Sequence, residues 1–359
     1  MEKENKPMEA KKYLPGRGLD VGTGFLVESR MLESGDVETK SVRDSFLELQ
    51  PRGDLVFKMM KKGLDKSGVS YIQEDKKLHI LGNDSLNVAI EKQMTVRRPM
   101  HKGVISPREA QALPLFKILL KELLGEPVVP NELVVYSVPA SPEDAPFDIE
   151  YHKNVIERVL ADLGFIGKAI NEAQAIVFCE LEEEDYTGIA ISCGSGMTNV
   201  CITNMAEVIT TFSVSKGGDY VDYSAATSLG YDPKDPKASD ITPSLMTYTK
   251  ESGISIKNPG NEMAEIAISS YYKALIKYMV ESIVNKIDSL ESKPRFLEPV
   301  KIVVSGGTSL AGDFLEVFKE EFEKIESKLP FKVKEVCHAR RPLEAVAEGA
   351  FIALAAEDE

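Results

Sequence analysis

The pattern of apolar and polar positions along the chain contains the same unit twice. Residues 18–31 place β-branched and small residues around a glycine turn, which predicts a strand, a tight turn and a second strand. Residues 191–198 repeat this arrangement about halfway along the sequence, between similar apolar stretches. Glycine at each turn lets backbone N–H groups approach a polyphosphate closely. Two related turns predict two related lobes that face such a ligand from opposite sides.

The remaining apolar positions divide between helical and strand-like spacing. Apolar residues at intervals of three and four predict helices over 54–64, 110–124, 152–163, 172–181 and 262–290. Short β-rich or continuously apolar runs predict strands over 42–49, 69–72, 77–81, 132–138 and 300–304. Residues 231–244 are rich in Pro and Asp and predict a loop. Strands that alternate with helices indicate an α/β fold.

Length and charge limit the domain organisation and the partners. A chain of 359 residues exceeds the usual size of one core, so we expect two domains. The formal net charge of -14 disfavours nonspecific binding to nucleic acid or to an anionic membrane, although a local basic patch stays compatible with it. We therefore expect no nucleic-acid partner. A nucleotide bound by such an acidic protein needs local neutralisation, most simply by a cation.

Two further features of the sequence bear on the location of the protein. No apolar run approaches the roughly 20 residues that cross a bilayer, and residues 1–12 lack the bulky apolar face of an interfacial helix. We expect a cytoplasmic protein without a transmembrane segment. The cysteines at 179, 193, 201 and 337 form no CxxC pair, so we expect reduced thiols that pack as small apolar side chains.

The two glycine turns indicate a site for a metal-bound triphosphate. Gly22-Thr23-Gly24 and Gly194-Ser195-Gly196 supply backbone donors for the phosphates. Asp20 precedes the first turn and is the candidate partner of Mg²⁺, through water molecules because magnesium sheds its hydration shell reluctantly. The alternative role of Asp20 is to stabilise a turn at a strand end. Thr23, Ser195 and Thr198 either add hydroxyl contacts to the ligand or cap turns.

Several separated motifs connect these turns to a known superfamily. In chain order they are the first glycine turn, 98–105, 170–175, the second glycine turn, 217–219 with Asp222, 305–309 and 341–350. On these motifs the chain is identified as a member of the actin and heat-shock chaperone ATPase superfamily, and it most resembles the bacterial cell-shape actin MreB. One glycine turn alone is a weak signal, whereas the order of several motifs is specific. The resemblance leaves 32–95 and 223–260 weakly matched.

The resemblance implies an actin-like ATPase fold, in which two related lobes each hold a mixed β-sheet flanked by helices and ATP with Mg²⁺ binds in the cleft between them. It implies that Glu172 positions and polarises the attacking water. The alternative for Glu172 is a carboxylate favoured by the positive end of a helix. Gly306 and Gly307 are expected to lie against base and ribose, with Ser309 capping the helix that follows. The other implied nucleotide contacts are Met197, Gly217, Gly218, Asp219, Lys250, Glu251 and Thr308.

The lobes are expected at 1–168 and 169–340, with a C-terminal helix over 341–355 that packs back on the first lobe. Two departures from the superfamily pattern bear on function. Ser192 stands where the superfamily usually has an aspartate that helps to organise the hydrated cation, so hydrolysis is expected to be slow or absent. The outer subdomain around 223–260 is expected to be smaller than in MreB, where it contributes to longitudinal filament contacts.

Three classes of function stay open. The first is a cytoskeletal ATPase that assembles into filaments when ATP is bound, favoured by 98–105 and 341–350. The second is a chaperone- or reactivase-like ATPase that couples lobe closure to an unidentified protein partner, favoured by Asn171 and Glu172. The third is a nucleotide-binding scaffold with little hydrolysis, favoured by Ser192. The sequence does not distinguish ATP from GTP.

Overall fold

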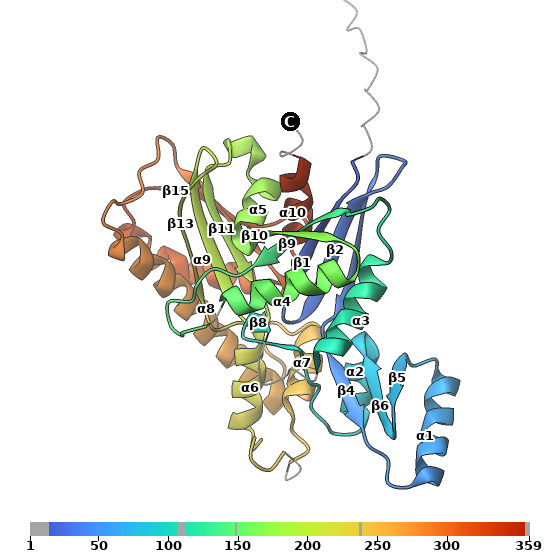
Figure 1. The fold of residues 1–359 in the computed structure, drawn as a ribbon. Helices are drawn as coiled ribbons and strands as arrows, with labels where there is room; N and C mark the ends of the chain where they lie inside the picture. Colours follow the sequence, from blue (N-terminus) through green and yellow to red (C-terminus); the bar gives the residue numbers. More distant parts are fainter. Residues whose placement is uncertain (1–13, 106–111, 148, 237–238, 356–359) are drawn as a thin grey trace, which may run out of the picture.

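Two five-stranded sheets form the framework of the molecule. The structure is a computed structural model that describes residues 14–105, 112–147, 149–236 and 239–355 (Figure 1). The first sheet contains β1 (Arg17–Val21), β2 (Phe25–Met31), β3 (Val37–Arg43), β9 (Leu133–Val138) and β10 (Ile166–Asn171). The second sheet contains β11 (Gly188–Cys193), β12 (Thr198–Asn204), β13 (Glu207–Val214), β14 (Val300–Ser305) and β15 (Val333–His338).

The two sheets share one topology. The strand orders are β10-β9-β1-β2-β3 and β13-β12-β11-β14-β15. In each sheet the central strand pairs antiparallel with the strand that follows it and parallel with a strand from much later in the chain. The glycine turns connect β1 to β2 and β11 to β12, so they occupy equivalent places in the two sheets. This equivalence agrees with the duplication that the sequence pattern predicts.

Helices cover the outer faces of both sheets, and two helices lie between the sheets. The inner helices are α5 (Glu172–Glu180) and α10 (Ala345–Ala355), which contact each other, while α10 packs on β1 and α5 packs on β11 (Figure 1). The outer helices are α3 (Leu113–Leu124) and α4 (Ile149–Asp162) on the first sheet, and α6 (Gly218–Ser228), α8 (Met263–Ser289) and α9 (Phe314–Glu323) on the second. Their buried apolar side chains recur at helical spacing, which is why these segments form helices against a sheet.

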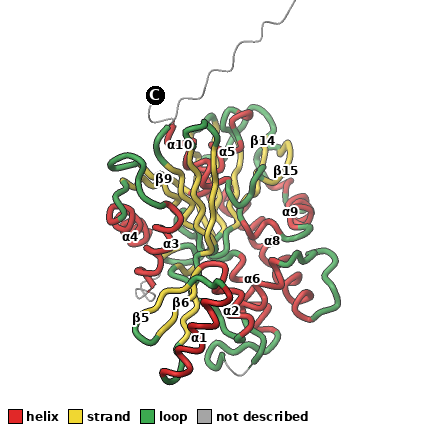
Figure 2. The backbone as a smooth tube through the Cα atoms, turned by 90° about the vertical axis from the view of Figure 1, so that its right-hand side faces the viewer, coloured by secondary structure: helices red, strands yellow, loops and turns green. Residues whose placement is uncertain are grey.

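A smaller unit lies at the end of the molecule opposite α10 (Figures 1 and 2). It consists of a three-stranded sheet with the order β4-β6-β5 and two helices that share a core around Leu47, Leu64 and Ile80. Its elements are β4 (Phe46–Leu49), α1 (Asp54–Ser67), β5 (Tyr71–Glu74), β6 (Lys77–Leu81) and α2 (Gly82–Glu91). The remaining elements are β7 (Met100–His101), β8 (Val104–Ile105), α7 (Pro243–Glu251), which contacts α2 and α6, and the 3₁₀ turns η2 (Glu182–Glu184), η3 (Gly307–Leu310) and η4 (Glu326–Lys328).

Two sequence-based expectations about local structure are wrong. The single strand expected over 42–49 is divided between β3 and β4, because Asp44 N–H donates to Gly24 O and the Ser45 hydroxyl binds Ser85, which turns the chain out of the first sheet. Ser309 does not cap the next helix. Its hydroxyl donates to Gly306 O at 2.7 Å and closes η3, whereas α9 begins later, directly after Asp313.

Other expectations stay as they were or fall outside the described residues. The predicted boundary between 168 and 169 falls within β10, and the division into lobes at 1–168 and 169–340 stays a prediction. Residues 1–12, for which no interfacial helix is expected, lie outside the described part of the chain. Among the described helices none is long and apolar enough to span a membrane. The cysteines are free thiols, with Cys179, Cys193 and Cys201 buried.

Candidate functional site

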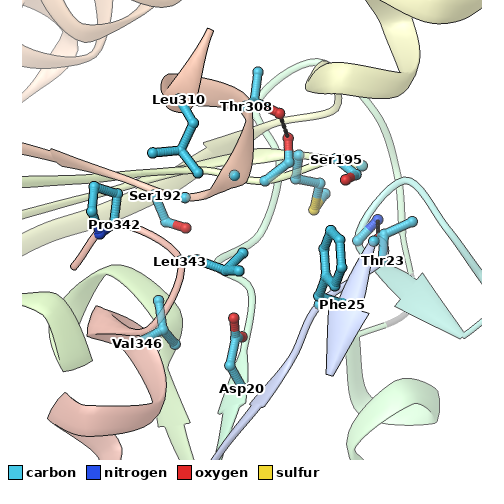
Figure 3. A pocket seen from close by; sticks show the side chains of 18 of the residues that line it. Asp20, Thr23, Phe25, Ser192, Ser195, Thr308, Leu310, Pro342, Leu343 and Val346 are labelled. Carbon is cyan, nitrogen blue, oxygen red and sulfur yellow. Dashed lines mark hydrogen bonds between the residues drawn. The ribbon is translucent and has the colours of Figure 1, made fainter. Parts of the chain in front are cut away.

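Both glycine turns line one pocket of about 310 Å³ (Figure 3). The first turn enters from the β1–β2 connection and the second from the β11–β12 connection. Each turn is closed by the same backbone hydrogen bond, from Gly22 N to Phe25 O at 3.1 Å and from Gly194 N to Met197 O at 2.9 Å. Two loops of identical construction, far apart in sequence, therefore bound the same space.

The two turns touch, and glycine makes that contact possible. A Cβ atom on Gly24 would lie 2.2 Å from Ser195 Oγ, and one on Gly196 would lie 2.5 Å from Thr23 Oγ1. Thr23 Oγ1 accepts a hydrogen bond from the backbone N–H of Gly103 at 3.0 Å, so the β7–β8 hairpin holds the first turn in place. A side chain at position 24 would collide with the Ser195 side chain, and one at position 196 would collide with the Thr23 hydroxyl and with the backbone of the β7–β8 hairpin at Gly103.

The pocket wall contains two interacting carboxylates. Asp20 Oδ1 accepts a hydrogen bond from the Ser137 hydroxyl at 2.7 Å, and Glu172 Oε1 accepts one from the Ser192 hydroxyl at 2.5 Å. Burial raises the pKa of both carboxyls, and for Glu172 the neighbouring Asp20 raises it further. The two groups titrate as a pair with pKa values of about 6 and about 8.

The N-terminus of α5 places Glu172 in this position. The Asn171 side chain accepts hydrogen bonds from the backbone N–H groups of Ala173 and Gln174, both at 3.1 Å, which fixes the start of the helix. Glu172 is then the first helical residue, where the helix dipole favours a negative charge. The Asn171 cap therefore fixes the helix start in the position that directs the Glu172 carboxylate into the pocket.

A row of three polar residues crosses the second sheet beside Glu172. Ser192, Asn199 and Ser213 are direct cross-strand partners on β11, β12 and β13, and all three are buried. Asn199 Nδ2 donates to Glu172 Oε2 at 2.9 Å, and Asn199 Oδ1 accepts from Ala140 N at 2.9 Å. Ser213 Oγ donates to Ala140 O at 2.8 Å. The row therefore fixes both oxygens of Glu172 and ties them to the segment that follows β9.

Apolar side chains form another part of the pocket wall. The segment before α10 contributes Pro342 and Leu343, α10 itself contributes Val346, and Leu310 and Ala311 come from the end of η3. Figure 3 shows Leu310, Pro342, Leu343 and Val346 around the same space as Asp20 and Ser192. Lys250 and Glu251 of α7 also line the pocket, and Tyr272 of α8 donates to Thr308 O at 3.3 Å. The pocket wall thus combines carboxylates, apolar side chains and the charged groups of α7.

Most of the residues that the sequence singled out line this pocket. They are Asp20, Gly22, Thr23, Gly24, Glu172, Gly194, Ser195, Gly196, Met197, Lys250, Glu251, Gly306, Gly307 and Thr308. The structure brings them together from elements of both sheets, which agrees with a common site. Their roles as ligands of a nucleotide or a cation stay predictions.

Five predicted contacts do not line the pocket, and their side chains or backbones have other partners. Thr198 Oγ1 donates to Lys216 O at 3.0 Å. Gly218 N and Asp219 N donate to the carbonyls of Gly194 and Ser195, and Gly217 packs against the same carbonyls, so this segment supports the second turn from behind. Asp219 also pairs with Arg98 Nη1 at 2.5 Å. The fifth is Ser309, whose hydroxyl closes η3.

Some lining residues escaped sequence reasoning. They are Val21, Phe25, Gly103, Gly253, Tyr272, Leu310, Ala311, Pro342, Leu343 and Val346. Phe25 and Tyr272 follow ordinary strand and helix patterns, which are typical of core residues. The segment 341–350 was recognised as a motif, but nothing local to it indicates that Pro342, Leu343 and Val346 face a pocket.

The polar residues of the pocket could hold a hydrated magnesium ion. The donors are all oxygen atoms, from the carboxylates of Asp20 and Glu172 and the hydroxyl of Ser192, and oxygen is the ligand that Mg²⁺ prefers. The described residues contain no group of three His, Cys, Asp or Glu side chains that could hold a metal alone. Such a site fits a cation that takes most of its ligands from water and phosphate.

Comparison with known proteins identifies the fold. The family model described as Volactin matches residues 16–354. No curated protein sequence matches the chain. Among solved structures, the fold is similar to a MamK double helical filament, with a TM-score of 0.64, 16% identity, and 96% of this chain and 98% of that chain covered. It is also similar to MreB5 of Spiroplasma citri bound to AMPPNP, with a TM-score of 0.59, 14% identity, and 97% and 98% covered. The fold is therefore actin-like, which confirms the fold predicted from the motifs.

Proposed function

The chain belongs to the volactin family, and from this premise we propose that it binds ATP with Mg²⁺ in the pocket between the two glycine turns. One observation carries the proposal. Two loops with the same closing hydrogen bond, in equivalent places of two sheets of one topology, line a single pocket that also contains the carboxylates of Asp20 and Glu172. The two lobes at 1–168 and 169–340, with α10 packed on the first, and a cytoplasmic location belong to the same proposal.

The glycine turns set the orientation of the nucleotide. The triphosphate lies at these turns, whose backbone N–H groups suit phosphate oxygens. The base lies against the apolar side chains of Leu310 and Leu343, with Gly306 and Gly307 close to the sugar. Lys250 and Glu251 also line the pocket and contact the ribose or the base. The AMPPNP and ADP bound in the MreB5 structures support a nucleotide as the ligand.

Asp20 is the residue that holds the cation, through water, and a bound Mg²⁺ supplies positive charge that offsets the phosphates of the nucleotide. Glu172 orients the attacking water, because its carboxylate is fixed on both oxygens and opens into the pocket. Hydrolysis is slow, since Ser192 adds no negative charge beside Asp20 to organise the hydrated cation.

Calorimetry with the purified full chain tests the binding. ATP is expected to release or take up heat with Mg²⁺ present and to bind more weakly after chelation, with GTP as the comparison for the base. Leu343→Glu places a charge among the apolar side chains, so we expect weaker ATP binding but unchanged binding of inorganic tripolyphosphate. If no purine triphosphate produces heat, the proposal fails. If Leu343→Glu weakens tripolyphosphate as much as ATP, the orientation is wrong.

We further propose that nucleotide binding controls self-association. The similarity of the fold to a MamK double helical filament supports this part of the proposal. Sedimentation with ATP and Mg²⁺ tests it: pelleting that depends on both ligands supports filaments. Closure without pelleting favours a chaperone-type ATPase with a protein partner. Nucleotide binding with neither closure nor turnover favours a scaffold. The specific observation in favour of this class is the Ser192 hydroxyl in place of a carboxylate.

A further inference from the structure

Helix α1 presents large apolar side chains to solvent at one end of the molecule. Leu55 is 72% exposed, Met59 is 67% exposed and Val56 is 47% exposed. The helix lies at the lower margin of the molecule, opposite α10, in both Figure 1 and Figure 2. Its inner side is anchored independently, because Leu64 is buried and Phe57 and Met60 pack on the core of the small unit. The exposed side chains therefore do not hold the helix in place.

Lysines accompany these apolar residues on the same side of the helix. Leu55, Met59, Lys62 and Lys66 are spaced by four, three and four residues, so they form one stripe along α1. Lys58 flanks the stripe. Within the part of the chain that the structure describes, Lys58, Lys62 and Lys66 form no ion pair. Between positions 51 and 77 there are seven Lys and Arg against four Asp and Glu, in a chain whose net charge is -14.

We propose that the outer face of α1 docks on an anionic lipid surface. Exposed apolar side chains beside lysines on a helix that lies flat are the pattern of an interfacial helix, since the apolar groups enter the acyl boundary and the ammonium groups reach the lipid phosphates. The local positive charge is complementary to such a surface, whereas the rest of the chain is repelled by it. Because the chain as a whole is acidic, the molecule is then oriented with α1 toward the lipid surface.

The charge of the face, and not its shape, favours an anionic lipid surface. Helix α1 lies at the margin of the molecule (Figures 1 and 2), and beside it Val56 and Met59 line a hollow together with residues of α2. Lys76 of the β5–β6 turn pairs with Asp54 at 2.8 Å and so neutralises the acidic residue in the first turn of α1. This contact is independent of the nucleotide pocket, to which α1 contributes no residue.

Flotation with vesicles tests the proposal. The purified full chain is mixed, without nucleotide, with vesicles of phosphatidylserine and phosphatidylcholine or of phosphatidylcholine alone, and then centrifuged through a density gradient. We expect flotation only with the anionic vesicles, and loss of it in high salt. Lys58→Gln, Lys62→Gln and Lys66→Gln together should weaken binding by on the order of 100-fold. Leu55→Gln with Met59→Gln should weaken it by at least about 10-fold.

Matched variants keep the test specific. Lys234→Gln, Lys273→Gln and Lys319→Gln remove the same charge from other exposed positions, and Met205→Gln with Met263→Gln replaces apolar side chains that are 73% and 67% exposed elsewhere. We expect both controls to float like the unchanged chain. Equal flotation with neutral vesicles, or equal losses in the control variants, overturns the proposal. Self-association of the chain through α1 in the absence of vesicles also overturns it and assigns the face to a second copy.

Discussion

The hydroxyl of Ser192 donates a hydrogen bond to Glu172 Oε1 at 2.5 Å. An ionised aspartate, which the superfamily usually has at this position, cannot donate that bond. It would place a third carboxylate beside Asp20 and Glu172 instead. With serine at this position the site lacks a charge that would attract a cation. It gains a hydrogen bond that fixes the carboxylate of Glu172 and lowers its pKa. The consequences of this exchange can be measured.

Ser192→Asp should increase the affinity for Mg²⁺ in the presence of ATP by roughly 10-fold or more, because a charged group is added beside the proposed cation site. Phosphate release should become faster at saturating Mg²⁺. Without ligands the variant should be less stable than the unchanged chain, since three carboxylates then share one buried site. Phosphate release measured against Mg²⁺ concentration checks the first two effects, and thermal unfolding checks the third.

Ser192→Ala is the control for this substitution. It removes the donor without adding charge, so the pKa of Glu172 should rise and the stability should fall by about 1 kcal/mol. The affinity for Mg²⁺ should change far less than in Ser192→Asp, because the substitution adds no charge. If Ser192→Ala and Ser192→Asp change the dependence on Mg²⁺ alike, position 192 does not act through its charge.

Asn199→Asp should slow hydrolysis by at least about 10-fold while nucleotide affinity changes little. The substitution keeps the shape of the side chain but replaces the Nδ2 donor by an acceptor that faces Glu172 Oε2, so the two carboxylates repel each other. Single-turnover phosphate release and nucleotide titration separate the two quantities. Asn204→Asp, at the end of the same strand, is the matched control and should leave the rate unchanged. Equal rates in both variants would remove Asn199 from the positioning of Glu172.

The ligand-free protein should lose stability as the pH rises from about 4 to about 8. Asp20 and Glu172 have folded-state pKa values of about 6 and about 8, above their ordinary values of 3.8 and 4.5. The stability that these groups contribute is present below their ordinary pKa values and is lost as the pH passes through the raised ones. Buried Asp44, whose pKa burial raises to about 8, acts in the same direction. Thermal unfolding should therefore show a Tm that falls by roughly 2–4 °C for each kcal/mol lost.

Glu172→Gln measures how much of the pH dependence of stability comes from the Glu172 carboxyl. A glutamine can keep both contacts, because its oxygen accepts from Asn199 and its amide donates to Ser192 Oγ. The variant should therefore fold normally and show a smaller fall of Tm with pH. His152, whose pKa burial lowers to about 4, contributes the same pH dependence to both proteins and cancels from the comparison. An unchanged pH profile would mean that Glu172 does not titrate in this range.

The parts of the site that the sequence predicts are those in which local pattern and chemistry coincide. Each glycine turn lies between two strands that are adjacent in sequence, so the strand pattern and the turn residues are read together. Glu172 directly follows the cap residue Asn171, so the cap and the start of the helix are also predicted together. Within these stretches the spacing alone restricts where the backbone and side chains lie, and the predicted residues do line one pocket.

The parts that the sequence does not predict depend on contacts between distant segments. Leu343 and Val346 reach the pocket only because α10 packs between the sheets, more than 100 residues after Glu172. Asn199 contacts Glu172 because β12 happens to face the start of α5, and no local pattern distinguishes it from an ordinary strand asparagine. Asp219 has the spacing of a nucleotide contact, but Arg98 takes its carboxylate. Tertiary packing decides which of several possible partners such a side chain binds.

Gly196→Ala should weaken nucleotide binding by at least about 10-fold and destabilise the chain by about 1–3 kcal/mol. Its Cβ atom would lie 2.4 Å from Gly103 N and 2.5 Å from Thr23 Oγ1, so the second turn must move away from the β7–β8 hairpin and from Thr23 of the first turn. Nucleotide titration and thermal unfolding measure the two effects. Gly63→Ala is the matched control, because it lies in α1 with no atom within 4 Å of the added Cβ. It should bind nucleotide normally and gain about 0.5–1 kcal/mol of stability. Unchanged nucleotide binding in Gly196→Ala would contradict the contact between the turns as a condition for the site.

Arg43→Ala should accelerate nucleotide release. Arg43 lies at the end of β3, its guanidinium stacks on the Phe25 ring at 4.5 Å, and its Nη2 pairs with Glu251 Oε2 at 2.5 Å. Phe25 and Glu251 both line the pocket, so this one side chain joins its two sides across 208 positions of sequence. The pair is partly exposed, and we expect about 1 kcal/mol of coupling in a double-mutant cycle with Glu251→Ala, read from release of a fluorescent nucleotide. Lys257→Ala breaks an exposed ion pair with Glu316 outside the pocket and should leave release unchanged. Additive effects of Arg43→Ala and Glu251→Ala on the release rate would show that the ion pair does not restrain the nucleotide.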